Sequence, residues 1–169
     1  MRALHCPNCG TPFIRVTHQE GGVERLLSHA NVFPFRCQLC TNRFRAIYSG
    51  ARHNTQAFDR RQYTRLMASI EAQVLGRNQP TATNRITDIS MDGCTLQTTG
   101  FPKGAFIELV LKPAVEDETI RIETAMVCSV HPSSVGIRFL EVPPEHHRRL
   151  GQVVLGLLVG QGLGPILNG

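Results

Sequence analysis

The chain has 169 residues, of which 41% are hydrophobic, so it can bury a core and is not a wholly disordered protein. This length corresponds to one domain or two small ones and excludes a large multidomain enzyme. The formal net charge is +5, and all of it falls within residues 1–53, where seven arginines face two glutamates. The sequence contains no apolar run of transmembrane length and no secretory leader, so we expect a cytoplasmic protein.

Two Cys-x-x-Cys pairs dominate the first third of the chain. Cys6 and Cys9 form one pair, Cys37 and Cys40 form the other, and 27 residues separate them. Two residues between cysteines let both sulfur atoms point at one centre from a tight turn, and two such turns supply the four ligands of tetrahedral zinc. We therefore predict a structural zinc site with all four cysteines as ligands. Gly10, directly after the first pair, is expected to take a positive φ.

Other interpretations of this region remain open. A redox-active pair normally uses one such motif in a βαβ setting, and structural disulfides need an oxidising compartment. His5 or His18 could replace a cysteine ligand, but four thiolates are sufficient. Basic side chains also flank the second pair and could contact phosphate groups, so a nucleic-acid binder acting through this region is an alternative. These side chains are Arg36, Arg43 and Arg45.

The spacing of apolar residues predicts the structure around the cysteines. Strands are expected near residues 13–16, 33–36 and 44–48, and about two turns of helix over 23–29. Phe33, Phe35 and Phe44 should pack beneath these strands. The segment holds too little apolar material to fold alone, so zinc binding would have to stabilise it. We predict a zinc ribbon over residues 1–50, followed by a polar linker at 51–57.

Alternating apolar residues indicate a second region of short strands, beginning with Leu66, Ala68, Ile70, Ala72 and Val74. Turn-forming residues separate the segments, as in a closed or nearly closed antiparallel barrel. The fold class is therefore mainly β, with a six-stranded barrel and a closing helix over residues 58–158. The six strands are expected at 66–74, 83–90, 94–98, 106–111, 120–130 and 135–140.

The last part of this region changes to a helical pattern. After Pro143 and Pro144, apolar residues recur with three- and four-residue spacing on one helical face. We expect this helix to close the barrel or pack in a dimer, with a membrane-surface helix as the alternative. A glycine-rich tail is expected at 159–169. The residues of the apolar face are Leu150, Val153, Val154, Leu157 and Leu158.

Two motifs accompany the predicted barrel. An Arg-x-x-x-Arg stretch runs from Arg61 to Arg65, just before the first strand, and such a pair alone is expected by chance in a chain with sixteen arginines. An Asp-x-Ser-x-x-Gly stretch follows, formed by Asp88, Ser90 and Gly93. The second pattern is rarely met by chance, and the order and spacing of the two motifs make the combination informative.

With both motifs at this spacing, the sequence resembles the PilZ family of bacterial receptors for the second messenger cyclic di-GMP. The segment from Val135 to Phe139 is similar to that family's late Gly-x-x-Phe strand. The resemblance covers about residues 58–155 and leaves out the predicted ribbon. It implies a barrel that binds cyclic di-GMP through both motifs. The implied ligand-binding residues are Arg60, Arg61, Arg65, Asp88, Ser90 and Gly93.

The chemistry of these residue types suits the implied ligand. Guanidinium groups pair bidentately with phosphate and with guanine O6 and N7, and they also stack on the base. Asp88 can accept hydrogen bonds from guanine N1–H and N2–H, and Ser90 offers a hydroxyl to phosphate or ribose. Gly93 allows a close backbone approach or a positive φ. Cys94 and Cys128 lie on expected strands and are interpreted as core residues.

The sequence contains no recognisable catalytic set, so we expect a receptor and not an enzyme. The leading hypothesis is a cytoplasmic bacterial effector, monomeric or homodimeric, that passes the cyclic di-GMP level to an unknown protein partner through a ligand-induced rearrangement. A ligand-independent protein-interaction adaptor is the second hypothesis. The nucleic-acid binder described above is the third.

Overall fold

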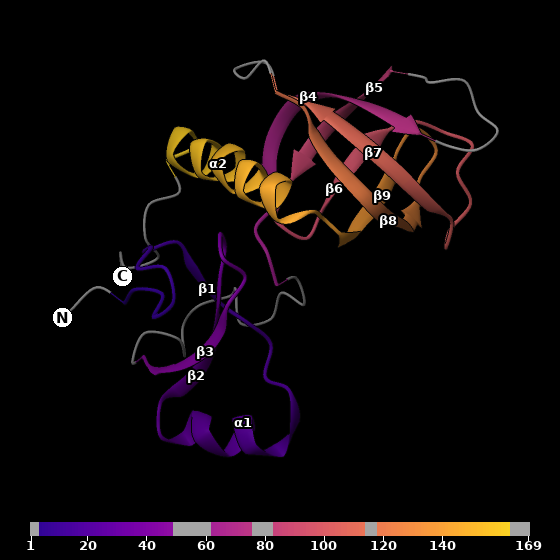
Figure 1. The fold of residues 1–169 in the computed structure, drawn as a ribbon. Coiled ribbons are helices and arrows are strands. Elements are labelled where there is room, and N and C mark those ends of the chain that lie inside the picture. Colours follow the sequence, from indigo (N-terminus) through magenta and orange to yellow (C-terminus); the bar gives the residue numbers. More distant parts are fainter. Residues whose placement is uncertain (1–3, 49–61, 76–82, 114–117, 163–169) are drawn as a thin grey trace. The chain divides into compact units, whose positions relative to one another are not determined.

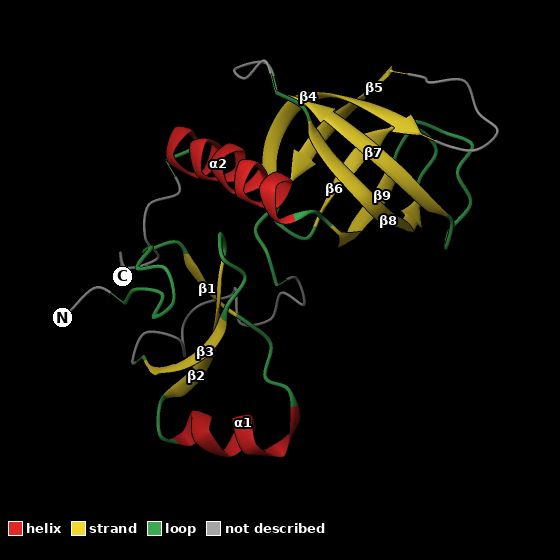
Figure 2. Cartoon of the chain, viewed as in Figure 1, coloured by secondary structure: helices red, strands yellow, loops and turns green. Residues whose placement is uncertain are grey.

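The computed structural model describes residues 4–48, 62–75, 83–113 and 118–162. The chain divides into two compact units, residues 1–64 with 158–169 and residues 65–157. Within the described residues, strands prevail in both units (Figure 2). The expected mainly-β fold class is confirmed.

The first unit contains a three-stranded antiparallel sheet in the order β1-β2-β3 (Figure 1). Its strands and helix lie where the apolar spacing predicts them. Gly21 begins the helix with a φ of 84°, which ends the extended segment that precedes it. The elements are β1 (Ile14–Val16), α1 (Gly21–His29), β2 (Val32–Cys37) and β3 (Arg43–Ile47).

Aromatic side chains fill the small core of this sheet. Phe33 and Phe35 are buried on β2, and the ring of Phe35 stacks on Phe44 with 5.8 Å between centroids. Tyr48 meets Phe35 edge-on at the same distance. The expected packing of the aromatic residues beneath the strands is therefore confirmed. The core also includes Cys6 and Cys37, so the cysteine cluster and the apolar core adjoin each other.

A buried carboxylate links α1 to β3. Glu24 accepts hydrogen bonds from Arg43 Nη2 at 2.8 Å, Arg45 Nη2 at 3.2 Å and the backbone N–H of Glu20 at 2.6 Å. Burial alone raises the pKa of a carboxyl group, but Arg43, the Glu20 amide and Arg45 outweigh it and hold the pKa of Glu24 below its usual value. Two of the three arginines that flank the second cysteine pair are thus paired with Glu24.

The second unit is a closed antiparallel barrel with the strand order β4-β5-β6-β9-β8-β7 (Figure 1). Closure comes from the pairing of β4 with β7, the last strand in this order. The expected six-stranded barrel is confirmed. Its strands are β4 (Leu66–Leu75), β5 (Thr83–Ile89), β6 (Gly93–Gln97), β7 (Phe106–Lys112), β8 (Ile120–Val130) and β9 (Val135–Glu141).

The barrel core follows the alternation of the sequence. On β4, Leu66, Ile70 and Val74 are buried, and a register shift between Met67 and Ile70 leaves Ala68 half-buried. Such a shift adds a residue to one strand and bends it. Cys94 is buried as expected, whereas Cys128 is only half-buried.

A C-terminal helix, α2 (Pro144–Gly160), follows β9. It begins at a proline, which suits the first helical position because its missing N–H would have no partner there. On the predicted apolar face, Leu150, Val154 and Leu158 are buried, and the other two residues, Val153 and Leu157, are half-buried. Within the described ranges, no helix has the length and apolarity needed to cross a membrane.

Candidate functional site

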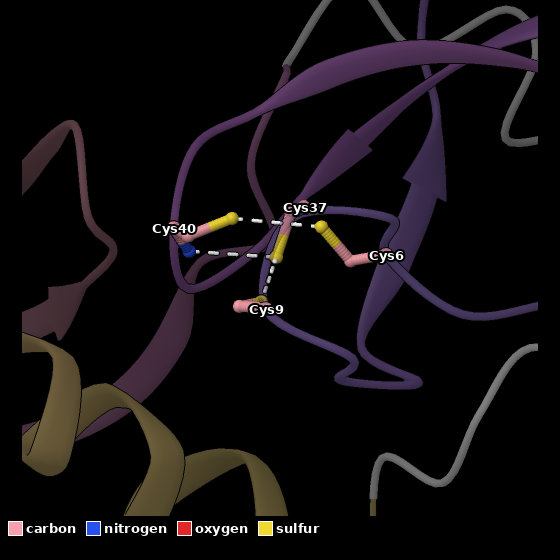
Figure 3. A group of neighbouring side chains, drawn as sticks. All are labelled: Cys6, Cys9, Cys37 and Cys40. Atoms are coloured by element: carbon pink, nitrogen blue, oxygen red, sulfur yellow. Dashed lines mark hydrogen bonds between the residues drawn. The ribbon is translucent and has the colours of Figure 1, made fainter.

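The four cysteines of the two pairs converge in the first unit (Figure 3). All four sulfur atoms lie within 4.8 Å of one another. Cys6 Sγ lies 3.5 Å from Cys40 Sγ, and Cys9 Sγ lies 3.6 Å from Cys37 Sγ. The sequence prediction that these residues form one cluster is confirmed, and among the described residues that group contains no histidine.

The two cysteine turns repeat the same backbone geometry. The N–H of Cys6 donates to the carbonyl of Thr11, and the N–H of Cys37 donates to the carbonyl of Asn42, both at 2.9 Å. The residue after each second cysteine is left-handed: Gly10 has a φ of 72° and Thr41 a φ of 62°. The positive φ expected at Gly10 is confirmed. The second turn places a β-branched residue in the same conformation, which is sterically unfavourable.

The cluster has the dimensions and donors of a tetrahedral thiolate site. Four sulfur atoms about 2.3 Å from one zinc ion would lie about 3.8 Å apart, close to the two sulfur–sulfur distances above. The N–H groups of Leu39 and Cys40 both point at Cys37 Sγ, at 3.4 Å each, and such donors stabilise a thiolate. Four soft sulfur donors favour zinc over the oxygen-seeking cations. The residues present therefore fit a structural zinc ion.

Local hydrogen bonds also favour ionisation at one of these cysteines. Burial raises the pKa of Cys40, but the Asn8 side chain and the Asn42 backbone act in the opposite direction and lower it to about 7. Cys37 is more deeply buried, and burial raises the pKa of its thiol. A metal ion would shift both thiols toward the thiolate form.

The second candidate site lies on the barrel, where β4 begins beside the β5–β6 hairpin. Arg65 Nη1 donates to Thr95 Oγ1 at 2.8 Å and to Asp88 Oδ1 at 3.3 Å. Thr95 Oγ1 donates to the same Asp88 oxygen at 3.0 Å, and Thr87 Oγ1 donates to the other at 3.3 Å. The Arg65 side chain is 44% exposed and that of Asp88 is 19% exposed. The structure thus joins one residue from each motif in an accessible ion pair.

Ser90 and Gly93 shape the hairpin turn that follows Asp88. Ser90 Oγ donates to the Gly93 carbonyl at 3.2 Å and accepts from the Asp92 N–H at 3.3 Å, so its hydroxyl is used inside the turn. Gly93 does not have a positive φ. A Cβ at Gly93 would overlap the carbonyl oxygen of Ile137 on β9, so the need for glycine comes from close strand contact. Both residues therefore have a structural role in addition to any ligand contact.

The structure brings together only part of the predicted residue set. Arg60 and Arg61 lie outside the described residues. Thr95 and Arg138 were not predicted: Thr95 faces Asp88 across the hairpin, and Arg138 Nε donates to Asp92 Oδ2 at 3.4 Å. The position of Thr95 beside Asp88 could have been predicted from the sequence, because a tight turn at 90–93 pairs residues 88 and 95. Arg138 required the β6–β9 register, which the sequence does not reveal.

Comparison with known proteins identifies the barrel. A family model described as PilZ domain matches residues 59–156. The structure is similar to the PilZ domain of YcgR from Escherichia coli with c-di-GMP, at 17% identity and a TM-score of 0.50, covering 61% of this chain and 95% of that one. It is also similar to the inhibitor of motility MotI/DgrA of Bacillus subtilis, at 17% identity and a TM-score of 0.52, covering 76% and 60%.

A third similar structure is MrkH of K. pneumonia in its apo state, at 17% identity and a TM-score of 0.52, covering 89% of this chain and 77% of that one. At such identities these similarities concern the fold. No curated protein matches the sequence. The family match spans more than half of the chain and contains both motifs, and the barrel has the expected six strands. The chain belongs to the PilZ domain family.

Proposed function

We propose that this protein is a receptor for cyclic di-GMP and has no catalytic activity of its own. The observation that carries the proposal is the Arg65–Asp88–Thr95 cluster, in which the two family motifs meet at an accessible position. The PilZ domain of YcgR, a similar structure, was solved with this ligand. The proposed ligand-binding residues are Arg60, Arg61, Arg65, Asp88, Ser90 and Gly93.

The charges of the cluster suit a ligand that carries both phosphates and guanines. Asp88 is an acceptor for the N1–H and N2–H donors of guanine. Arg65, held beside it, can pair with a phosphate or stack on a base. Thr95 orients both partners, because its hydroxyl accepts from Arg65 and donates to Asp88. The hairpin turn braced by Ser90 keeps Asp88 in place.

The four-cysteine cluster has a structural role in this proposal. Cys6, Cys9, Cys37 and Cys40 would hold one zinc ion, which supplies cross-linking of the two cysteine turns. Four protein ligands leave no position for a substrate or water. The first unit is then a small rigid platform and not a reaction centre.

Ligand binding is proposed to order the stretch from Ala57 to Arg65 beyond the hydrogen bonds that already hold residues 62–64, and to pass this change to a protein partner. Since the ligand is an intracellular messenger of bacteria, we place the receptor in the bacterial cytoplasm. The nucleic-acid hypothesis is weaker than the sequence indicated, because Glu24 pairs with Arg43 and Arg45. Their charge is partly neutralised within the fold.

Calorimetric titration of the zinc-loaded protein tests the proposal. Saturable binding of cyclic di-GMP is expected, with about tenfold or greater loss in Arg65→Ala and in Asp88→Ala, since each removes a charged hydrogen-bonding group. Cyclic di-AMP is the ligand control, because adenine lacks the N1–H and N2–H donors that Asp88 would accept. Absence of binding by a folded wild-type protein would contradict the receptor function.

A protease experiment tests the rearrangement separately. Cleavage within Ala57–Arg65 should slow when saturating cyclic di-GMP is added to the wild-type protein, and the Asp88→Ala variant should show no such protection. Equal cleavage rates with and without bound ligand would leave binding intact but refute the ordering of this stretch.

A further inference from the structure

The three residues between the motif arginines Arg61 and Arg65 belong to the first unit and are hydrogen-bonded to its second cysteine turn. Gln38, which lies between Cys37 and Cys40, donates from Nε2 to the carbonyl of Gln62 at 3.2 Å. The N–H of Thr64 donates to Gln38 Oε1 at 2.7 Å. One side-chain amide thus pairs with the backbone on both sides of Tyr63. We call residues 62–64 the docked segment.

The side chains of the docked segment are also held. Arg36 Nη1 on β2 donates to Tyr63 Oη at 3.4 Å, and its guanidinium lies 5.7 Å from the centroid of the Tyr63 ring. Arg15 Nη1 on β1 donates to Thr64 Oγ1 at 3.1 Å. Arg15 and Arg36 are direct partners across the β1–β2 ladder, so neighbouring positions of one sheet bind neighbouring residues of the segment.

Burial shows that this is a formed contact and not a loose surface approach. Tyr63 is 8% exposed and Gln38 is 5% exposed. Gln38 Nε2 also donates to the carbonyl of Arg36 at 3.2 Å, which fixes the amide against its own turn. A buried amide with partners for both its donor and its acceptor is costly to displace.

The docked segment ends one peptide bond before a proposed ligand residue. Thr64 is the last residue of this part of the first unit, and Arg65 begins the second unit, where it pairs with Asp88 and Thr95. The backbone directly before Arg65 and directly after Arg61 is therefore constrained by the cysteine-turn region. Constraint of a binding segment before ligand arrives lowers the conformational entropy lost on binding.

We propose that Gln38 is a positioning residue for the Arg-x-x-x-Arg motif, and that Arg15 and Arg36 assist it. By holding residues 62–64, the first unit restrains the backbone that leads into Arg65 and raises the affinity for cyclic di-GMP. The inference rests on the proposed receptor function and adds a direction of coupling to it. Because coupling between two equilibria is reciprocal, bound ligand must in turn stabilise the docked segment.

The test compares full-length, zinc-loaded wild type with Gln38→Ala, and with Gln152→Ala as the matched control, since Gln152 is exposed on α2. The readouts are zinc content, hydrogen exchange of the Thr64 amide and cyclic di-GMP affinity. In Gln38→Ala we expect unchanged zinc content, Thr64 exchange faster by about tenfold or more, and affinity weaker by about tenfold. Gln152→Ala should match wild type in all three.

Tyr63→Phe provides a second variant that leaves the cysteine turn untouched. It removes the acceptor for Arg36 and keeps the ring, so about a two- to threefold loss of affinity is expected. If Gln38→Ala loses zinc, Tyr63→Phe and Thr64→Val decide the question. If wild type binds cyclic di-GMP and both Tyr63→Phe and Thr64→Val bind it with unchanged affinity, the positioning role alone would be overturned. Absence of binding by wild type would overturn the receptor function, and this inference with it.

Discussion

The two units of this protein are stabilised by different physical means. The barrel buries a continuous apolar core, in which side chains such as Leu96, Leu109 and Ile120 are completely inaccessible. The apolar core of the first unit has six buried residues, two of which are cysteines. In the same unit, charged side chains join α1 to β3. Apolar burial scales with the size of a domain, so the smaller unit needs other contributions. The two units should therefore unfold under different treatments.

Metal removal should produce the largest difference in stability between the two units. Chelation, or Cys37→Ser, is expected to unfold the ribbon, because zinc binding contributes on the order of 10–16 kcal/mol in small modules of this kind. The barrel should retain its exchange protection, since its core contains no metal ligand. Site-resolved hydrogen exchange measures both in one sample. Simultaneous loss of protection in β4–β9 would show that the two units are not energetically distinct.

A cavity made in the barrel core should have the opposite effect: it should destabilise the barrel and leave the first unit intact. Leu109→Ala is expected to lower the free energy of unfolding of the barrel by about 2–5 kcal/mol, because Leu109 is completely buried. Zinc content should remain unchanged. Leu140→Ala is the matched control, since Leu140 is 49% exposed and its truncation should cost no more than about 0.5 kcal/mol. Equal effects of the two variants in chemical denaturation would contradict the core assignment.

The buried carboxylate of the ribbon gives a smaller effect with a defined pH dependence. Glu24→Gln should destabilise the ribbon by about 1.5–3 kcal/mol, the typical contribution of hydrogen bonds to a charged group. The folded-state pKa of Glu24 lies below its ordinary value of about 4.5, so its stabilisation is complete above that pH and is lost as the pH falls through the folded-state pKa.

Denaturation of wild type and Glu24→Gln at equal zinc content, from pH 7 downward, measures this effect. The difference in stability should stay constant to about pH 5 and then narrow in acid. Glu145→Gln, at an exposed position of α2, should leave ribbon stability unchanged at every pH. A difference that widens in acid would contradict the assigned sign.

The smallest effect compares the two cysteine turns with each other. Thr41→Gly should stabilise the ribbon by about 1 kcal/mol, because glycine adopts the left-handed conformation without the steric penalty of a β-branched side chain. Gly10→Ala should have the opposite sign and a similar size, since no atom lies near its added Cβ and only the φ matters. Competition with a chelator of known zinc affinity measures both changes. If both substitutions changed the zinc affinity in the same direction, the two cysteine turns would not be equivalent.

Local sequence patterns were sufficient for much of this structure. Period-two alternation, together with the turn-forming residues between segments, predicted all six barrel strands to within a few residues. The paired Cys-x-x-Cys spacing predicted the cysteine cluster. The positive φ of Gly10 could be predicted because it depends only on the local turn. The strands of the barrel could be found without knowing their partners, since alternation depends only on which face is buried.

Long-range contacts were beyond the sequence. The burial of Glu24 depends on α1 packing against β3, and glutamate ordinarily indicates an exposed position. The requirement for glycine at Gly93 depends on the approach of β9, and the sequence offered positive φ as an equal explanation. The docking of residues 62–64 on Gln38 joins positions 24 to 26 apart through one amide, for which no pattern exists.

The most direct test of the receptor function is an amide-resolved NMR titration of the zinc-loaded protein with cyclic di-GMP. Saturable shifts are expected first at the amides of Arg65, Asp88 and Thr95, with core amides such as that of Leu109 unaffected. The Asp88→Ala variant should show no saturable change at these positions. A folded wild-type protein whose spectrum stays unchanged at millimolar ligand would contradict the assignment of this barrel as a cyclic di-GMP receptor.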